Sequence, residues 1–124
     1  DARTAEAAVA AFGSARMVAA TEPLVALLDR RDPMSRHRAL RIRALQALAE
    51  LGDPAVLPRI KQFFRTWFAL VSPEERRAAY ASLEFYPAPA RRPWVRQGLR
   101  ASDRVVRETC LRLNADADGP DESR

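Results

Sequence analysis

Residue types that support catalysis, metal binding and cross-linking are scarce in this chain of 124 residues. Its only cysteine, Cys110, cannot form a disulfide within the chain, which agrees with a reducing compartment. Its only histidine, His37, has neither a cysteine nor a second histidine with which to share a metal. The sequence also lacks a glycine-rich phosphate loop and a Ser-His-Asp arrangement. We therefore expect a protein without enzymatic activity, cofactor or bound metal.

Long apolar runs are absent as well. Apolar residues make up 48% of the chain, yet no stretch approaches the roughly 18 consecutive apolar residues of a membrane helix. Residues 1–14 begin with an acidic residue and lack the organisation of a signal peptide. These features predict a protein that does not associate with membranes and is located in the cytoplasm.

Lysine is nearly missing too, because Lys61 is the single lysine among 21 basic residues. The formal net charge of +5 is unevenly distributed. Residues 114–124 contain four acidic residues and one arginine, so they carry −3 and residues 1–113 carry +8. Arginine suits bidentate contacts with carboxylate and phosphate groups. The charge of residues 1–113 therefore indicates an anionic partner, whereas residues 114–124 are expected to form an acidic flexible tail.

The sequence does contain an internal repeat of 35 residues. Prolines recur at this spacing, and an arginine follows each of them seven positions later. The prolines are Pro23, Pro58 and Pro93, and the arginines are Arg30, Arg65 and Arg100. A second set of arginines recurs at spacings of 35 and 31, each followed three positions later by a small residue. These arginines are Arg41, Arg76 and Arg107, and the small residues are Ala44, Ala79 and Cys110.

Both halves of the repeat have the periodicity of helices. Apolar residues between Leu40 and Leu51 form two adjacent stripes, as expected for a helix that is buried on two sides. Gly52 suits the end of this helix, and Ser72 with Glu75 suits the capping box of a later one. The pattern predicts helices at residues 3–12, 17–30, 34–51, 55–70, 73–85, 89–101 and 102–113. We expect an all-α fold in which residues 1–113 form about three and a half helical hairpins, stacked into a right-handed superhelix.

The clearest copy of the repeat, residues 40–64, resembles the HEAT repeats of the bacterial type that also occur in phycobilisome lyases. The matching residues are Leu40, Arg41, Ala44, Leu48, Leu51, Gly52, Asp53, Pro54, Ala55, Val56 and Pro58. Weaker copies lie at residues 75–93 and 106–113. The resemblance implies a HEAT/armadillo-like solenoid, in which the arginines at positions 41, 76 and 107 bond acidic or carbonyl groups of the adjacent turn. Such arrays serve as scaffolds, adaptors and lyase subunits, and rarely as DNA-repair enzymes, so the fold does not fix the function.

The arginines that follow the repeated prolines form the most prominent candidate site. If the repeats stack in register, Arg30, Arg65 and Arg100 recur at intervals of about 10 Å. Lys61 and Arg96 lie one helical turn before the second and third of them. This stripe could bind an acidic protein surface or a phosphate backbone. Alternatively, each arginine complements the dipole at a helix C-terminus.

Aromatic residues give a second set of candidates. Trp94 occupies the position that Leu24 and Arg59 hold in the other repeats, so we expect it to be partly exposed and to contribute to an interface. Four further aromatic residues are expected to lie mainly in the core. These are Phe63, Phe64, Trp67 and Phe68.

The sequence thus predicts a non-catalytic protein–protein interaction or scaffold module, part of a larger bacterial protein, that binds an acidic protein partner. The expected binding residues are Arg30, Lys61, Arg65, Trp94, Arg96 and Arg100. Two alternatives stay open. One is nucleic-acid binding through the same face, by analogy with HEAT-like DNA glycosylases, and the other is a chromophore-lyase-type subunit.

Overall fold

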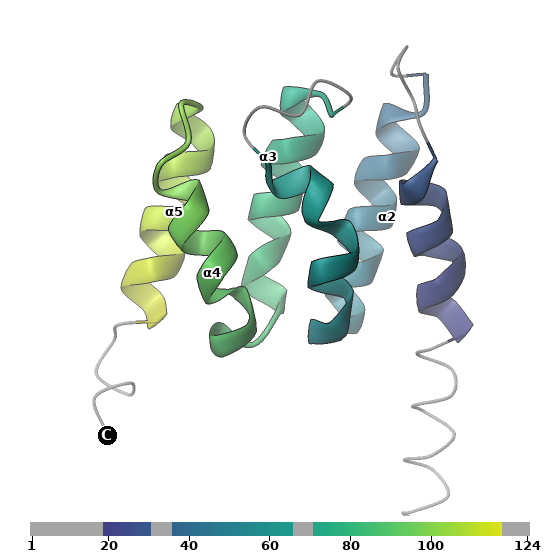
Figure 1. Cartoon of the computed structure of the whole chain (residues 1–124), viewed down its shortest axis with the longest axis horizontal. Coiled ribbons are helices and arrows are strands. Elements are labelled where there is room, and N and C mark those ends of the chain that lie inside the picture. The colour runs from purple at the N-terminus through teal and green to yellow at the C-terminus, as the bar shows by residue number, and fades with distance from the viewer. Residues whose placement is uncertain (1–18, 31–35, 66–70, 118–124) are drawn as a thin grey trace, which may run out of the picture.

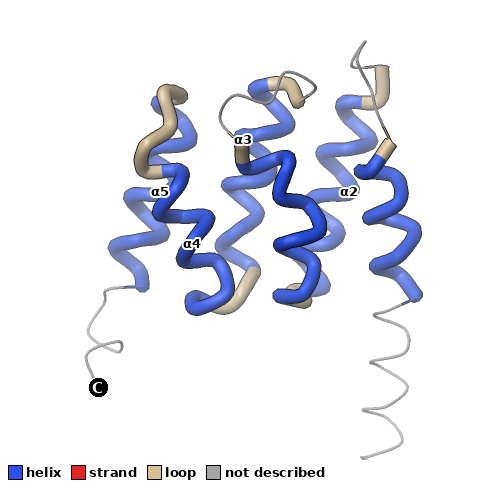
Figure 2. The backbone as a smooth tube through the Cα atoms, viewed as in Figure 1, coloured by secondary structure: helices blue, strands red, loops and turns tan. Residues whose placement is uncertain are grey.

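The computed structural model describes residues 19–30, 36–65 and 71–117 of the chain. Every regular element in these ranges is helical, and the ranges contain no strand (Figure 2). The prediction of an all-α fold is therefore confirmed. The predicted helix at residues 3–12 lies outside the described residues.

Short helices follow one another along the described chain. Residues 19–29 form the first of them. The next elements are α2 (Arg38–Leu51), η1 (Pro54–Phe64), α3 (Pro73–Ser82), η2 (Leu83–Phe85), α4 (Ala88–Gly98) and α5 (Arg104–Ala117). η1 and η2 are 3₁₀ helices, and the others are α-helices.

The 3₁₀ conformation of η1 corrects the expectation of a regular helix over residues 55–70. Pro58 lies inside the element and has no N–H group, and its ring would clash with the carbonyl four residues earlier. An α-helical hydrogen bond is therefore impossible at this point, and Ile60 adopts non-helical angles of φ −116° and ψ 24°. The backbone is extended at Arg65, so the element ends at Phe64.

Other helix ends differ from the predicted ones by a few residues. α2 begins at Arg38 rather than at residue 34, and α4 ends at Gly98 rather than at residue 101. α5 continues to Ala117, beyond the predicted end at residue 113. Residues 114–117 of the expected tail are therefore helical, and residues 118–124 lie outside the described part of the chain.

Side-chain and glycine caps define several of the helix ends. Gly52 has a φ of 69° and donates its N–H to the carbonyl of Leu48 at 3.2 Å, as expected for a left-handed C-cap. The Ser72 hydroxyl accepts a hydrogen bond from the backbone N–H of Glu75 at 3.2 Å, which confirms the predicted cap of α3. At the start of α5, the Asp103 carboxylate accepts one from the N–H of Val105 at 2.9 Å.

The helices form two layers, with one hairpin beside the next (Figure 1). We call the layer of α2, α3 and α5 the first layer, and the layer of residues 19–29, η1 and α4 the second layer. α3 contacts both α2 and α5 within the first layer, and η1 contacts α4 within the second. The C-terminal ends of the second-layer helices lie at the same end of the molecule (Figure 1).

Small residues occupy equivalent buried positions in the first-layer helices. Ala44, Ala79 and Cys110 are all buried, as the repeat register predicted. The glycine at the end of α4 is required by its surroundings, because a Cβ at Gly98 would lie 2.2 Å from the Sγ of Cys110. Phe63 and Phe64 are fully buried, which confirms their predicted place in the core. The predicted core residues Trp67 and Phe68 lie outside the described ranges.

None of the helices in the described ranges is both long enough and apolar enough to cross a bilayer.

Candidate interaction surface

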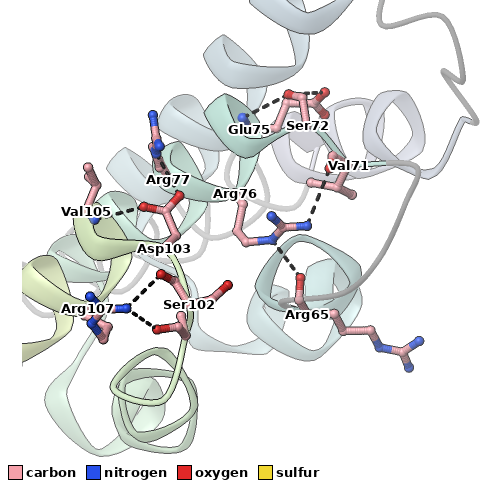
Figure 3. A network of polar contacts seen from close by, with 11 residues as sticks. Arg65, Val71, Ser72, Glu75, Arg76, Arg77, Ser102, Asp103, Val105 and Arg107 are labelled. Carbon is pink, nitrogen blue, oxygen red and sulfur yellow. Dashed lines mark hydrogen bonds and ion pairs between the residues drawn. The ribbon is translucent and has the colours of Figure 1, made fainter.

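Repeated arginines connect the helices of the first layer to the loops between the layers (Figure 3). Arg41 donates from Nη1 to the backbone carbonyl of Arg30 at 2.6 Å. Arg76 donates from a different atom, Nε, to the carbonyl of Arg65 at 2.7 Å, the equivalent carbonyl one repeat later. The last member of the set, Arg107, donates to two carbonyls at 2.8 Å, those of Ala101 and Ser102. The resemblance to HEAT repeats implied this use of the three arginines, and the contacts confirm it.

A buried ion pair joins α2 to α3. The Nε of Arg41 lies 2.8 Å from a carboxylate oxygen of Glu75, and the two side chains are 5% and 1% exposed. The other carboxylate oxygen of Glu75 accepts a hydrogen bond from the Ser72 hydroxyl at 3.0 Å. The guanidinium of Arg41 also lies 5.0 Å from the ring centroid of Phe63. This pair fixes the position of one first-layer helix on the next.

One backbone carbonyl fixes the position of α4 beside η1. The carbonyl of Phe64, at the end of η1, accepts hydrogen bonds from the Tyr80 hydroxyl and from the Gln97 side-chain amide. Because Tyr80 belongs to α3 and Gln97 to α4, three elements meet at this atom. Burial raises the pKa of the Tyr80 hydroxyl to about 12, so it stays a hydrogen-bond donor at neutral pH. The sequence pattern gave no indication of this contact.

All the basic residues predicted to bind a partner lie in or directly after second-layer helices. Arg30 follows the helix at residues 19–29, Lys61 and Arg65 lie on and after η1, and Arg96 and Arg100 on and after α4. Arg30, Lys61, Arg96 and Arg100 are exposed, and Arg65 is half-buried. The side chain of Arg65 points away from Arg76 (Figure 3).

Four of these residues form a two-by-two group, which we call the basic quartet: Lys61, Arg65, Arg96 and Arg100. Lys61 lies on η1 and Arg96 on α4, whereas Arg65 and Arg100 directly follow the ends of these two elements. The two helices are neighbours held together at the Phe64 carbonyl. Pro93, Gln97 and the two quartet arginines of α4 line a surface hollow of about 380 Å³.

Acidic side chains are missing from the segments that carry the basic quartet. Neither residues 54–65 nor residues 88–102 contain an aspartate or glutamate. Two other cations of these segments make structural contacts. Arg59 forms an ion pair with Glu22, and Arg91 donates to backbone carbonyls at the end of η2, including that of Tyr86 at 3.1 Å. Arg92 is exposed on α4 and adds to the positive charge, although the repeat comparison did not single it out.

Trp94 is half-buried and lies against the core rather than standing free on the surface. Its ring stacks on that of Phe64, with the ring centroids 5.1 Å apart and an interplanar angle of 26°. Only part of the indole is therefore available to a partner. Among the described residues, Phe85 is more exposed, at 55%, and lies beside a hollow of about 190 Å³ between α2 and α3.

The described residues offer little reactive chemistry. They contain no group of three or more His, Cys, Asp or Glu side chains placed to hold a metal ion. Cys110 is fully buried, and this burial raises the pKa of its thiol to about 11. A thiol in such surroundings stays protonated at neutral pH. Cys110 therefore fills a core position, as the register predicted.

Two layers of helical hairpins with repeated arginine contacts define the described chain as an α-helical repeat protein. Residues 40–66 match the family model of the PBS lyase HEAT-like repeat, so the resemblance expected from the sequence is confirmed over this segment. The match covers α2 from Leu40 onward, the following turn and η1. No curated protein and no solved structure gives a match to the chain.

Proposed function

We propose that this chain is a non-catalytic interaction module that holds an acidic partner protein on the second layer. The basic quartet is the observation that carries the proposal. Its four cations lie on or directly after η1 and α4, which contain no acidic residue, and the Phe64 carbonyl holds these two elements together. A preformed surface loses little conformational entropy when it binds, which favours a scaffold role.

The HEAT-like repeat at residues 40–66 supports this class of function, because helical arrays present extended surfaces to their partners. We further infer that the hairpins form a right-handed superhelix of about three and a half repeats within a larger bacterial protein. Arg30 and the exposed edge of Trp94 would then extend the binding face beyond the quartet.

Reversing the charge of Arg65 and Arg100 tests the proposal. The double variant Arg65→Glu/Arg100→Glu is compared with Arg43→Glu/Arg112→Glu, which changes the net charge equally but on exposed first-layer positions. Fluorescently labelled poly-L-glutamate serves as the acidic probe, and binding is followed by anisotropy at increasing salt. We expect the quartet variant to lose at least tenfold in affinity and the control much less. Binding by the wild type should weaken as salt screens the charges.

Two outcomes would contradict the proposal. Equal losses in both variants would mean that net charge rather than the quartet attracts the probe. For the second outcome, binding of duplex DNA is measured in the same way. Tighter binding of the duplex, with a steep linear fall of log affinity with log salt, would indicate a nucleic-acid binder instead. Circular dichroism of both variants confirms that the fold is retained.

A further inference from the structure

We infer that the surface hollow on α4 holds a phosphoserine or phosphothreonine side chain of the acidic partner. The hollow has a volume of about 380 Å³ and is lined by Pro93, Arg96, Gln97 and Arg100. It contains two members of the basic quartet, so this use rests on the proposed function and narrows the partner to a phosphorylated segment. α4 packs against η1, α3 and α5, so described elements surround the helix that carries the hollow.

Three arginines in and directly after α4 make no hydrogen bond or ion pair with any other described residue. They are Arg92, Arg96 and Arg100, and all three are exposed. Arg92 and Arg96 lie one turn apart on the helix, where like charges repel each other. Residues 88–102 contain no carboxylate that would offset this repulsion. An anionic ligand would supply the counter-charge that the segment itself does not contain.

The helix dipole does not account for the whole set of cations. The negative end of a helix stabilises cations only within about its last turn. Arg96 lies in the last turn of α4 and Arg100 follows its C-cap, but Arg92 lies near the middle of the helix. The neighbouring Arg91 has a structural use, because it donates to the carbonyls of Glu84 and Tyr86 at 3.1 Å. The exposed arginines have no such contact among the described residues.

Two guanidinium groups beside one hollow suit a phosphoryl group better than a carboxylate. A guanidinium is a planar fork of N–H donors that binds the oxygens of either group in pairs. One carboxylate carries a single charge and occupies one fork. A phosphorylated side chain carries a charge of about −1.5 to −2 and has oxygens for two forks. Arg96 and Arg100 together therefore match one phosphoryl group in charge and in donors.

Hydrogen bonds to neighbouring elements hold one wall of the hollow in place. The side-chain nitrogen of Gln97 donates to the Phe64 carbonyl at the end of η1. The same nitrogen lies 3.4 Å from the Tyr80 hydroxyl of α3. The amide is therefore fixed before a ligand binds, and binding costs little side-chain entropy at this residue.

Two peptides that differ only at their centre test the inference. Both consist of alternating glycine and aspartate and carry a fluorescent label. One has a central phosphoserine, and the other has two adjacent glutamates, which match the charge of phosphoserine. Binding is measured by anisotropy. We expect the wild-type chain to bind the phosphoserine peptide at least fivefold more tightly, because at equal charge the peptides differ in the arrangement of their oxygens.

Charge-conserving substitutions assign the preference to the hollow. Arg96→Lys/Arg100→Lys keeps the net charge but replaces both forks by ammonium groups. This variant should bind the two peptides equally. Arg43→Lys/Arg112→Lys is the matched control on exposed first-layer positions, and it should keep the preference of the wild type. A preference that survived in Arg96→Lys/Arg100→Lys would place the phosphoryl group elsewhere and overturn the inference.

The remaining outcomes separate this inference from the proposed function. If poly-L-glutamate binds through the quartet but the wild type binds both peptides equally, only the phosphoryl assignment is wrong. If neither poly-L-glutamate nor the peptides bind, the proposed function fails with it. A short DNA duplex is also added as a competitor. If it displaces the labelled phosphoserine peptide at a lower phosphate concentration than the unlabelled peptide does, the hollow holds a nucleic-acid backbone and the inference is wrong.

Discussion

Close packing at single residues sets the distance between α4 and its neighbours. Gly98 lies where α4 crosses the side chains of Cys110 and Tyr80, and a Cβ there would be 2.2 Å from Sγ and 2.7 Å from the ring of Tyr80. Neither neighbour is free to move, because both are completely buried and Tyr80 is also hydrogen-bonded to Phe64. A single methyl group would therefore disturb three elements.

Gly98→Ala should destabilise the chain by about 1–3 kcal/mol, the usual cost of overpacking a core. The double variant Gly98→Ala/Cys110→Ala should recover part of this loss, because it removes the closest of the contacting atoms. Urea unfolding followed by circular dichroism gives both free energies. If the two substitutions proved additive, the contact between α4 and α5 would be looser than the structure indicates.

Adjacent elements of the first layer are joined by polar contacts of unequal burial. Glu75 and Arg41 are enclosed, whereas Glu74 and Arg38 are about half exposed. An enclosed pair contributes little net stability when it is compared with an apolar pair, but removing one partner leaves an uncompensated charge. The two neighbouring glutamates of one helix turn therefore have different roles.

Glu75→Gln should destabilise the chain by about 3 kcal/mol, because Arg41 would remain buried without its counter-charge. Glu74→Gln is the matched control, one residue away on the same turn, and should change the unfolding free energy little. Chemical denaturation at neutral pH measures both variants. Similar losses in the two would show that the helix cap, rather than the buried pair, determines the stability of this junction.

The molecule as a whole should be less stable in alkaline solution. Burial raises the pKa of Tyr80 and Tyr86 to about 12 and that of the Cys110 thiol to about 11. These groups bind protons more tightly in the folded chain than in the unfolded chain, where their pKa values are near 10 and 9. Their contribution is therefore complete below about pH 9 and is lost as the pH rises towards 12.

Tyr86→Phe isolates one part of this effect. The Tyr86 hydroxyl is buried and has no hydrogen-bond partner among the described residues, so its removal should not destabilise the chain at pH 7. The variant should lose less stability than the wild type between pH 9 and 11, as measured by urea unfolding at each pH. An unchanged pH dependence would mean that Tyr86 titrates at its ordinary pKa.

Local sequence determined the helical class, several caps and the residues that pack between the layers. Helical periodicity, the capping pattern of Ser72 and the small residues at the positions of Ala44, Ala79 and Cys110 are all visible in the sequence, because they depend on neighbours within a few turns. Pro58 is also visible in the sequence and explains the 3₁₀ conformation of η1, whereas the sequence pattern predicts a helix over residues 55–70.

Tertiary structure alone decided which of the equivalent residues are covered. Leu45, Tyr80 and Leu111 share one position of the repeat, but within the described residues Leu45 and Tyr80 are completely buried and Leu111 is 58% exposed. Trp94 and Phe64 stack, and Gln97 reaches the Phe64 carbonyl, although these residues lie about a repeat apart. Periodicity identifies the face of a helix that is apolar or charged. It does not identify the element opposite that face, because burial and hydrogen-bond partners depend on contacts between distant parts of the chain.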